Sequence, residues 1–93
     1  MGKRLTDSEI QEQLSGLDGW ALDGNAIRKQ YILGGFPDAV AFVARLAFDA
    51  EAADHHPDIL INFKRVTLTF STHSEGGLTD KDFAGARKVD QLL

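Results

Sequence analysis

The chain has 93 residues, 43% of them hydrophobic and 26% charged, which suits one globular domain over residues 1–93 and leaves no room for a second core. It contains no cysteine, so disulfides, thiolate metal sites and cysteine nucleophiles are excluded. Its net charge is -4 with scattered basic residues, and no apolar run approaches the roughly 20 residues of a membrane span, so we expect a cytoplasmic protein with no direct nucleic-acid or membrane contact.

The first third of the chain predicts a short amphipathic helix followed by a β-hairpin. Thr6 and Glu9 have the spacing of a capping box, and apolar residues recur at helical intervals after them. Those apolar residues are Ile10, Leu14 and Leu17. Residues 20–22 and 26–32 are two short strand-like runs, and residues 23–25 between them, Asp-Gly-Asn, tolerate the positive φ of a tight turn.

A long helix should follow, from Pro37 towards Ala53. Proline suits the first helical turn because its missing N–H would have had no partner within the helix. The helix has a broad apolar face for packing on a sheet. One stripe of this face consists of Phe36, Val40, Val43 and Ala47, and beside it lie Phe42, Leu46 and Ala50. Pro57 cannot continue a helix and disfavours helical geometry at His56, so the helix should end near His55 and His56.

The remainder of the chain predicts two strands and a last helix. Residues 58–63 suit a strand, and residues 65–73 alternate as in a half-buried strand that ends at His73. One face would carry Val66, Leu68 and Phe70, and the other Thr67, Thr69, Ser71 and His73. Residues 78–93 suit a helix with apolar positions at Phe83, Ala86, Val89 and Leu93. The predicted order is helix, two strands, helix, two strands, helix.

The three histidines are the candidates for chemistry. Glu51 and His55 are four residues apart, so on a helix they would share a face and the carboxylate could orient the imidazole. His56 lies beyond helical geometry, so its ring should leave in another direction. Histidine titrates near neutral pH, so a site built from His55, His56 and His73 could transfer protons both ways without a metal or cofactor.

Structural alternatives exist for each of these residues. A histidine near a helix C-terminus can simply cap carbonyl groups and interact with the helix dipole. His73 can simply end a solvated strand face. Asp82 lies three residues after Thr79, so its first interpretation is a capping-box partner for the last helix.

A metal site is a further alternative, because Glu51 and Asp54 could add oxygen ligands to the three imidazoles. Vicinal histidines chelate one ion awkwardly, however, and neither the His-x3-His nor the His-Glu-x-x-His spacing occurs in the chain. We therefore predict no metal.

This ordered set of residues resembles the pterin-4a-carbinolamine dehydratase family. The family pattern has an acidic or polar residue, then His-His-Pro, an aromatic residue, a histidine on the second strand and an aspartate after the following loop. The matching residues are Glu51, His55, His56, Pro57, Phe63, His73 and Asp82. The similarity covers nearly the whole chain and includes the Gly-Trp pair at 19–20, the Ser-Thr-His run at 71–73 and the segment at 77–82.

The resemblance implies an α+β fold, in which helices pack on one face of a four-stranded antiparallel sheet, and assembly as a homodimer or homotetramer. It also implies dehydration of 4a-hydroxytetrahydropterin, the product left by aromatic amino acid hydroxylases, to quinonoid dihydropterin, without a cofactor. His55, His56 and His73 would be catalytic. The residues expected to bind or orient the substrate are Glu51, Asp54, Pro57, Phe63 and Asp82.

Two features of the resemblance leave alternatives open. The family often has tryptophan or tyrosine two residues after the proline, and this chain has Ile59, so packing beside the pterin can differ. Some family members serve as a dimerisation cofactor of a transcription factor or as a Rubisco assembly factor. A non-catalytic binding or assembly module is therefore the alternative function, although three retained histidines favour catalysis.

Overall fold

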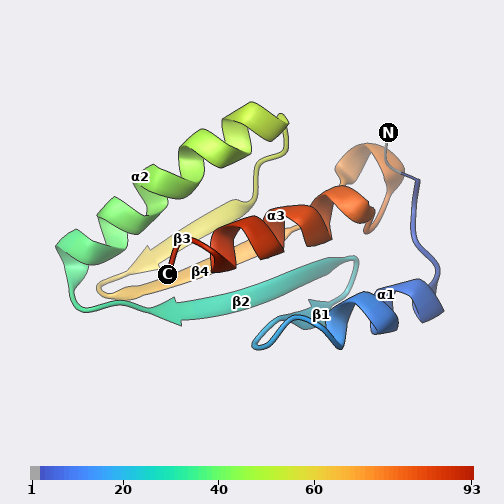
Figure 1. Ribbon diagram of the computed structural model, residues 1–93, viewed down its shortest axis with the longest axis horizontal. Helices are drawn as coiled ribbons and strands as arrows, with labels where there is room; N and C mark the ends of the chain where they lie inside the picture. Colours follow the sequence, from blue (N-terminus) through green and yellow to red (C-terminus); the bar gives the residue numbers. More distant parts are fainter. Residues whose placement is uncertain (1–2) are drawn as a thin grey trace.

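The structure is a computed structural model that describes residues 3–93 (Figure 1). Its elements confirm the predicted order α-β-β-α-β-β-α and the α+β class. The elements are α1 (Asp7–Leu14), β1 (Ala21–Asp23), β2 (Ala26–Ile32), α2 (Phe36–Ala53), β3 (Asp58–Asn62), β4 (Arg65–Phe70), the short 3-10 helix η1 (His73–Glu75) and α3 (Asp80–Asp90). Within residues 3–93, no helix is both long and apolar enough to cross a membrane.

The four strands form one antiparallel sheet in the order β1-β2-β4-β3. The two central strands, β2 and β4, pair along the whole length of β4. β3 pairs with β4 from Asp58 opposite Thr69 to Asn62 opposite Arg65, so its outer edge is free among the described residues. The last residues of α2, the start of β3 and the end of β4 all lie at the same end of the sheet (Figure 1).

The core lies on one face of this sheet, beneath the helices (Figure 1). The buried face of β4 consists of Val66, Leu68 and Phe70, as the alternation predicts. From α2, the Phe42 ring packs with its centroid 5.0 Å from the Tyr31 ring of β2. From α3, Gly85 faces Phe70 so closely that an added Cβ would lie 2.7 Å from the ring.

One part of the α2 prediction is wrong. The side chains that pack on the sheet are Ala39, Phe42 and Leu46, whereas Phe36 and Val40 are 52% and 43% exposed. Each residue advances about 100° around a helix, so the stripe through Phe36 and Val40 points away from the stripe through Phe42 and Leu46. The broad apolar face therefore has a buried half and an exposed half.

Candidate functional site

The end of α2 sends two adjacent imidazoles in different directions. Asp54, the residue after the helix, is left-handed at φ 52° and ψ 42°, and its N–H donates to the carbonyls of Ala50 and Glu51. A left-handed cap of this kind stops the helix and turns the chain. The His55 side chain then lies inward and is 10% exposed, whereas that of His56 is 55% exposed.

Asp82 is the hydrogen-bond partner of His55. Its Oδ1 lies 2.6 Å from Nε2 of the imidazole, and the residue is fully buried. Its Oδ2 accepts hydrogen bonds from the Thr72 hydroxyl at 2.8 Å and from the Thr79 N–H at 2.9 Å. Asp82 is thus the capping-box partner of Thr79, as predicted, and the same carboxylate is also the partner of His55.

Glu51 pairs with His56, so the predicted pair of Glu51 with His55 is wrong. Glu51 Oε1 lies 2.8 Å from His56 Nε2, and the two side chains are exposed. The prediction assumed helical geometry as far as His55, but α2 ends at Ala53 and the left-handed Asp54 takes the chain out of helical phase. The site therefore contains two histidine–carboxylate pairs, one buried and one exposed.

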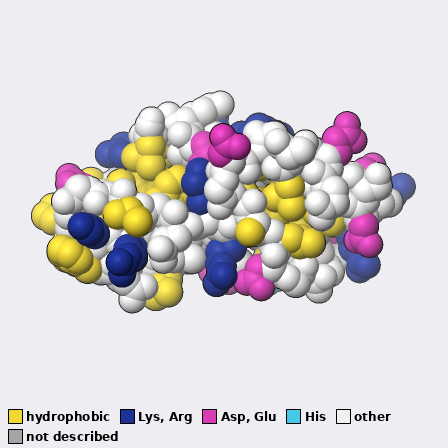
Figure 2. Space-filling view, turned by 90° about the horizontal axis from the view of Figure 1, so that it is seen from below, with side chains coloured by type: hydrophobic (Ala, Val, Ile, Leu, Met, Phe, Trp, Pro, Cys, Tyr) yellow, Lys and Arg dark blue, Asp and Glu magenta, His cyan; other side chains and the backbone are white. Residues whose placement is uncertain are grey.

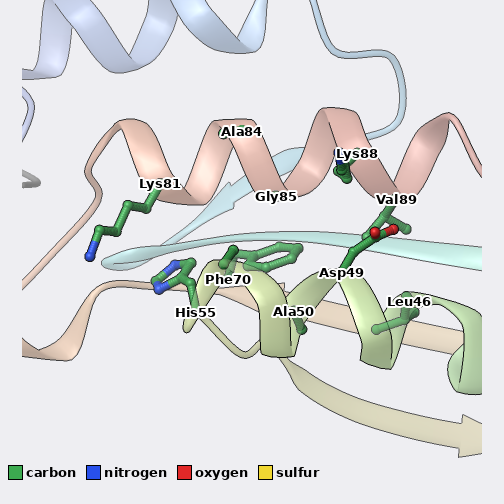
Figure 3. A pocket seen from close by; sticks show the side chains of 11 residues that line it. Leu46, Asp49, Ala50, His55, Phe70, Lys81, Ala84, Gly85, Lys88 and Val89 are labelled. Carbon is green, nitrogen blue, oxygen red and sulfur yellow. The ribbon is translucent and has the colours of Figure 1, made fainter.

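An aromatic ring supports the buried pair. The His55 imidazole stacks on Phe70, with ring centroids 5.9 Å apart and an interplanar angle of 18°. Figure 3 shows the two rings side by side between α2 and α3, where they line a largely apolar pocket of about 270 Å³. Lys81 extends from α3 past the imidazole in the same view. His55 is thus held by a carboxylate at its edge and a ring at its face.

His73 reaches the site from the turn after β4. The strand ends at Phe70, earlier than predicted, and His73 begins η1 instead of ending the strand. A bridge between Thr72 and Gly77 closes the turn. All three histidines line one pocket of about 370 Å³. The other lining residues are Asp54, Asp58, Thr69, Ser71, Thr72, Ser74 and Lys81.

The remaining predicted residues lie at different distances from this histidine pocket. Asp54 lines it, and Pro57 is buried where the chain enters β3. Phe63 lies in the β3–β4 turn and is 69% exposed. The length of β3, about 16 Å at ~3.3 Å per residue, separates that turn from the pocket. Contrary to expectation, the structure does not bring Phe63 to the histidines.

Several lining residues were not singled out from the sequence. The alternation along residues 65–73 predicts Thr69 and Ser71 on the same polar face as His73, so the sequence does contain a signal for these two. Thr72 has no such signal, because the same alternation places it on the face of Val66, Leu68 and Phe70. In the structure it follows β4 and is buried, with 6% exposed. Lys81 lies in the first turn of α3, and only the packing of α3 against the α2 exit brings it to the pocket.

The histidines and carboxylates of the site do not form a cluster suited to a metal ion. In the part of the chain that the structure describes, no three His, Asp or Glu side chains are gathered so that they could hold a metal together. The arrangement offers instead two separate imidazole–carboxylate pairs and a third imidazole, which is chemistry suited to proton transfer.

Comparison with known proteins identifies the family of this chain. The family model described as pterin 4 alpha carbinolamine dehydratase matches residues 3–92. A protein of Roseiflexus sp. (strain RS-1), named for pterin-4-alpha-carbinolamine dehydratase, is 53% identical over 93 residues, which is 100% of both chains.

Solved structures show the same fold. A crystal structure from Brucella melitensis, described as a transcriptional coactivator/pterin dehydratase, has a TM-score of 0.92 and 42% identity, covering 97% of this chain and 98% of that one. A pterin dehydratase-like RuBisCO assembly factor of the alpha-carboxysome has a TM-score of 0.64 and 24% identity, covering 78% and 84%, which shows likeness of fold alone. The family match and the full-length identity establish that this chain belongs to the pterin-4-alpha-carbinolamine dehydratase family.

Proposed function

We propose that this protein is a hydro-lyase that dehydrates 4a-hydroxytetrahydropterin to quinonoid dihydropterin by histidine acid–base catalysis, in the recycling of tetrahydrobiopterin in the cytoplasm. The observation that carries the proposal is the convergence of His55, His56 and His73 on one pocket, from a helix exit and from a turn that are distant in sequence. Three convergent imidazoles have no evident use in a module that only binds another protein.

The reaction needs an acid and a base at two ends of one bond. The C4a hydroxyl leaves as water once it receives a proton, and N5 loses its proton as the N5–C4a double bond forms. A pocket that holds the substrate between a proton donor and a proton acceptor supplies both needs without a cofactor.

The buried pair suits the base. An ionised carboxylate accepts hydrogen bonds only, so His55 presents Nε2–H to Asp82 and keeps the lone pair of Nδ1. Nδ1 itself has no hydrogen-bond partner. Among the described residues, every buried side-chain nitrogen or oxygen has a partner, so Nδ1 is not buried and is open to solvent. We assign Nδ1 of His55 to the proton of N5.

The exposed pair suits the acid. His56, paired with Glu51, lies at the solvent side of the pocket, where an imidazolium can donate a proton to the departing hydroxyl and be reprotonated from water. We assign His73 to holding the pterin or sharing the acid role. In this assignment Asp82 orients His55, and Glu51 orients His56 instead of His55.

The test is a stopped-flow dehydration assay with synthetic 4a-hydroxytetrahydropterin. We expect the wild-type protein, treated with a chelator, to accelerate dehydration well above the spontaneous rate. A wild-type protein without this activity would contradict the proposal and favour the alternative, a non-catalytic binding or assembly module.

We also propose that the chain forms a homodimer or homotetramer through the free edge of β3. Ile59 and Leu60 on this strand are 41% and 56% exposed, and no charged residue interrupts residues 59–61. A free edge whose central residues are uncharged is a template for pairing with another copy. Figure 2 shows further hydrophobic side chains gathered at the left end of the molecule, which is the end of β2, the start of α2 and the β3–β4 turn in Figure 1. Ile32, Phe36 and Phe63 belong to these segments and are exposed.

Sedimentation at micromolar concentration tests this assembly. The wild type should sediment as a multiple of 10.2 kDa, and Leu60→Lys should shift it to the monomer. Leu22→Lys is the matched control, because Leu22 is 44% exposed on β1, the other and shorter edge of the sheet. A wild type found only at 10.2 kDa would contradict the proposal.

A further inference from the structure

Asp82, the partner of the His55 imidazole, is the centre of a buried hydrogen-bond network. Asp82 and Thr79 are fully buried and Thr72 is 6% exposed. Thr72 Oγ1 lies 2.8 Å from Asp82 Oδ2 and 2.8 Å from Thr79 Oγ1. Thr79 Oγ1 also accepts from the N–H of Lys81 at 3.2 Å. The network therefore joins the first turn of α3, the segment after β4 and the end of α2.

Proton counting gives this network one direction. A hydroxyl has a single proton, and that of Thr72 goes to the acceptor-only carboxylate of Asp82. The Thr79 hydroxyl must then donate to Thr72, and its oxygen remains free to accept from Lys81. The Thr72 hydroxyl and the Thr79 N–H both donate to Asp82, which only accepts. The hydrogen bond between His55 Nε2 and Asp82 therefore requires a proton on Nε2. The network thus specifies the Nε2–H tautomer of His55.

The main chain of Thr72 fixes a second histidine. Its N–H donates to the Gly77 carbonyl at 3.1 Å, and its own carbonyl accepts from the Gly77 and Glu75 N–H groups at 3.4 and 3.0 Å. These bonds define the turn on which His73, the next residue, begins η1. One residue thereby connects the positions of His55 and His73.

We propose that Thr72 is a positioning residue of the site, acting through Asp82. Its hydroxyl holds the carboxylate in the orientation that keeps His55 in the Nε2–H tautomer, with the lone pair of Nδ1 free to accept a proton. For its effect on turnover, this inference rests on the proposed dehydratase function. The tautomer of His55 is a property of the free protein and can be measured whatever the activity.

Three variants separate this role from simple packing. Thr72→Val keeps the shape and removes the hydroxyl, and Thr72→Ser keeps the hydroxyl. The control is Thr67→Val, the same change on β4 at a half-buried threonine outside the pocket, whose hydroxyl only accepts from Gln30 at 3.4 Å. If Thr72→Val does not fold, Thr72→Cys takes its place, because a thiol is a weak donor of similar size.

The readouts are the imidazole ¹⁵N chemical shifts, which report the tautomer of each histidine, and the steady-state constants of dehydration. We expect one Nε2–H tautomer of His55 in the wild type, Thr72→Ser and Thr67→Val, and a tautomer mixture in Thr72→Val. Turnover of Thr72→Val should fall about 10- to 100-fold with KM nearly unchanged, by analogy with the loss of hydrogen-bond partners that orient metal-ligating histidines. Thr72→Cys should shift both readouts in the same direction.

The proposal is overturned if Thr72→Val, or Thr72→Cys in its place, keeps a single Nε2–H tautomer of His55. This holds even if its melting temperature falls, since a merely structural threonine would produce that result. A wild type with the Nε2–H tautomer but no dehydratase activity would contradict the proposed function and leave the positioning role standing.

Discussion

Two histidine–carboxylate pairs stand side by side in this protein and differ in burial. His55 and Asp82 lie 2.6 Å apart with side chains 10% and 0% exposed, and His56 and Glu51 lie 2.8 Å apart with side chains 55% and 82% exposed. A pair in water gains little, because solvent screens it, whereas a buried pair depends on its partner to replace lost hydration. Although the two distances are similar, the buried pair therefore fixes the His55 ring, whereas the exposed pair leaves the His56 ring adaptable.

The largest expected effects are on turnover. His55→Ala and His56→Ala should each lower kcat by roughly 10²- to 10⁴-fold, as for a lost general acid or base. The two variants should differ in stability, because only His55→Ala leaves a buried carboxylate without its imidazole partner. Stopped-flow rates and urea unfolding measure both. Wild-type rates in both variants would remove the catalytic interpretation of the two pairs.

The next effect separates the two carboxylates. Asp82→Asn should lower the free energy of unfolding by about 2–4 kcal/mol, because a buried amide cannot accept from His55, Thr72 and the Thr79 N–H together. Glu51→Gln, the matched change in the exposed pair, should cost no more than about 0.5 kcal/mol. Denaturant titration measures both values, and equal losses would show that burial does not distinguish the pairs.

A smaller effect should follow from crowding the ring beneath His55. In Gly85→Ala the new Cβ would lie 2.7 and 2.9 Å from atoms of the Phe70 ring, on which the imidazole stacks. Overpacking of this kind costs about 1–3 kcal/mol. Gly16→Ala is the control, since the nearest atom to its Cβ would be 3.7 Å away. Similar melting temperatures for the two variants would show that Phe70 can move freely.

The smallest effect at neutral pH concerns a third carboxylate, Asp90, which accepts from Tyr31, Lys29 and the indole of Trp20. Burial, and then the hydrogen bond to Asp90, raises the pKa of the Tyr31 phenol above its ordinary value. The protonated phenol therefore favours the folded state. This contribution is fully present below the unfolded pKa of about 10 and is lost as the pH rises towards the folded pKa.

Tyr31 is the single tyrosine of the chain, so its ionisation can be followed directly by ultraviolet absorbance. We expect no phenolate in the folded protein as the pH passes 10, and a free energy of unfolding that declines there. Tyr31→Phe should abolish that decline. Phenolate formation near the ordinary pKa, in a protein still folded, would contradict the expectation.

Much of the fold could be predicted because it depends on neighbours in sequence. The capping boxes at Thr6 and Thr79 need only a residue three positions on, and Pro57 ends helical geometry through its own ring. The alternation along β4 assigns its buried face without any knowledge of the partner strands. These are local effects, and the structure reproduces them.

The site could be predicted only as a set of residues. Which carboxylate meets which imidazole depends on the left-handed backbone at Asp54 and on the packing of α3 against Phe70, neither of which has a local signature. The exposure of Phe36 and of Phe63, 52% and 69%, likewise depends on how α2 and β3 pack in the whole fold. By itself, the sequence determined the elements, their order and the three histidines; the tertiary structure decided their partners, because contacts between residues 27 positions apart are set by how whole elements pack.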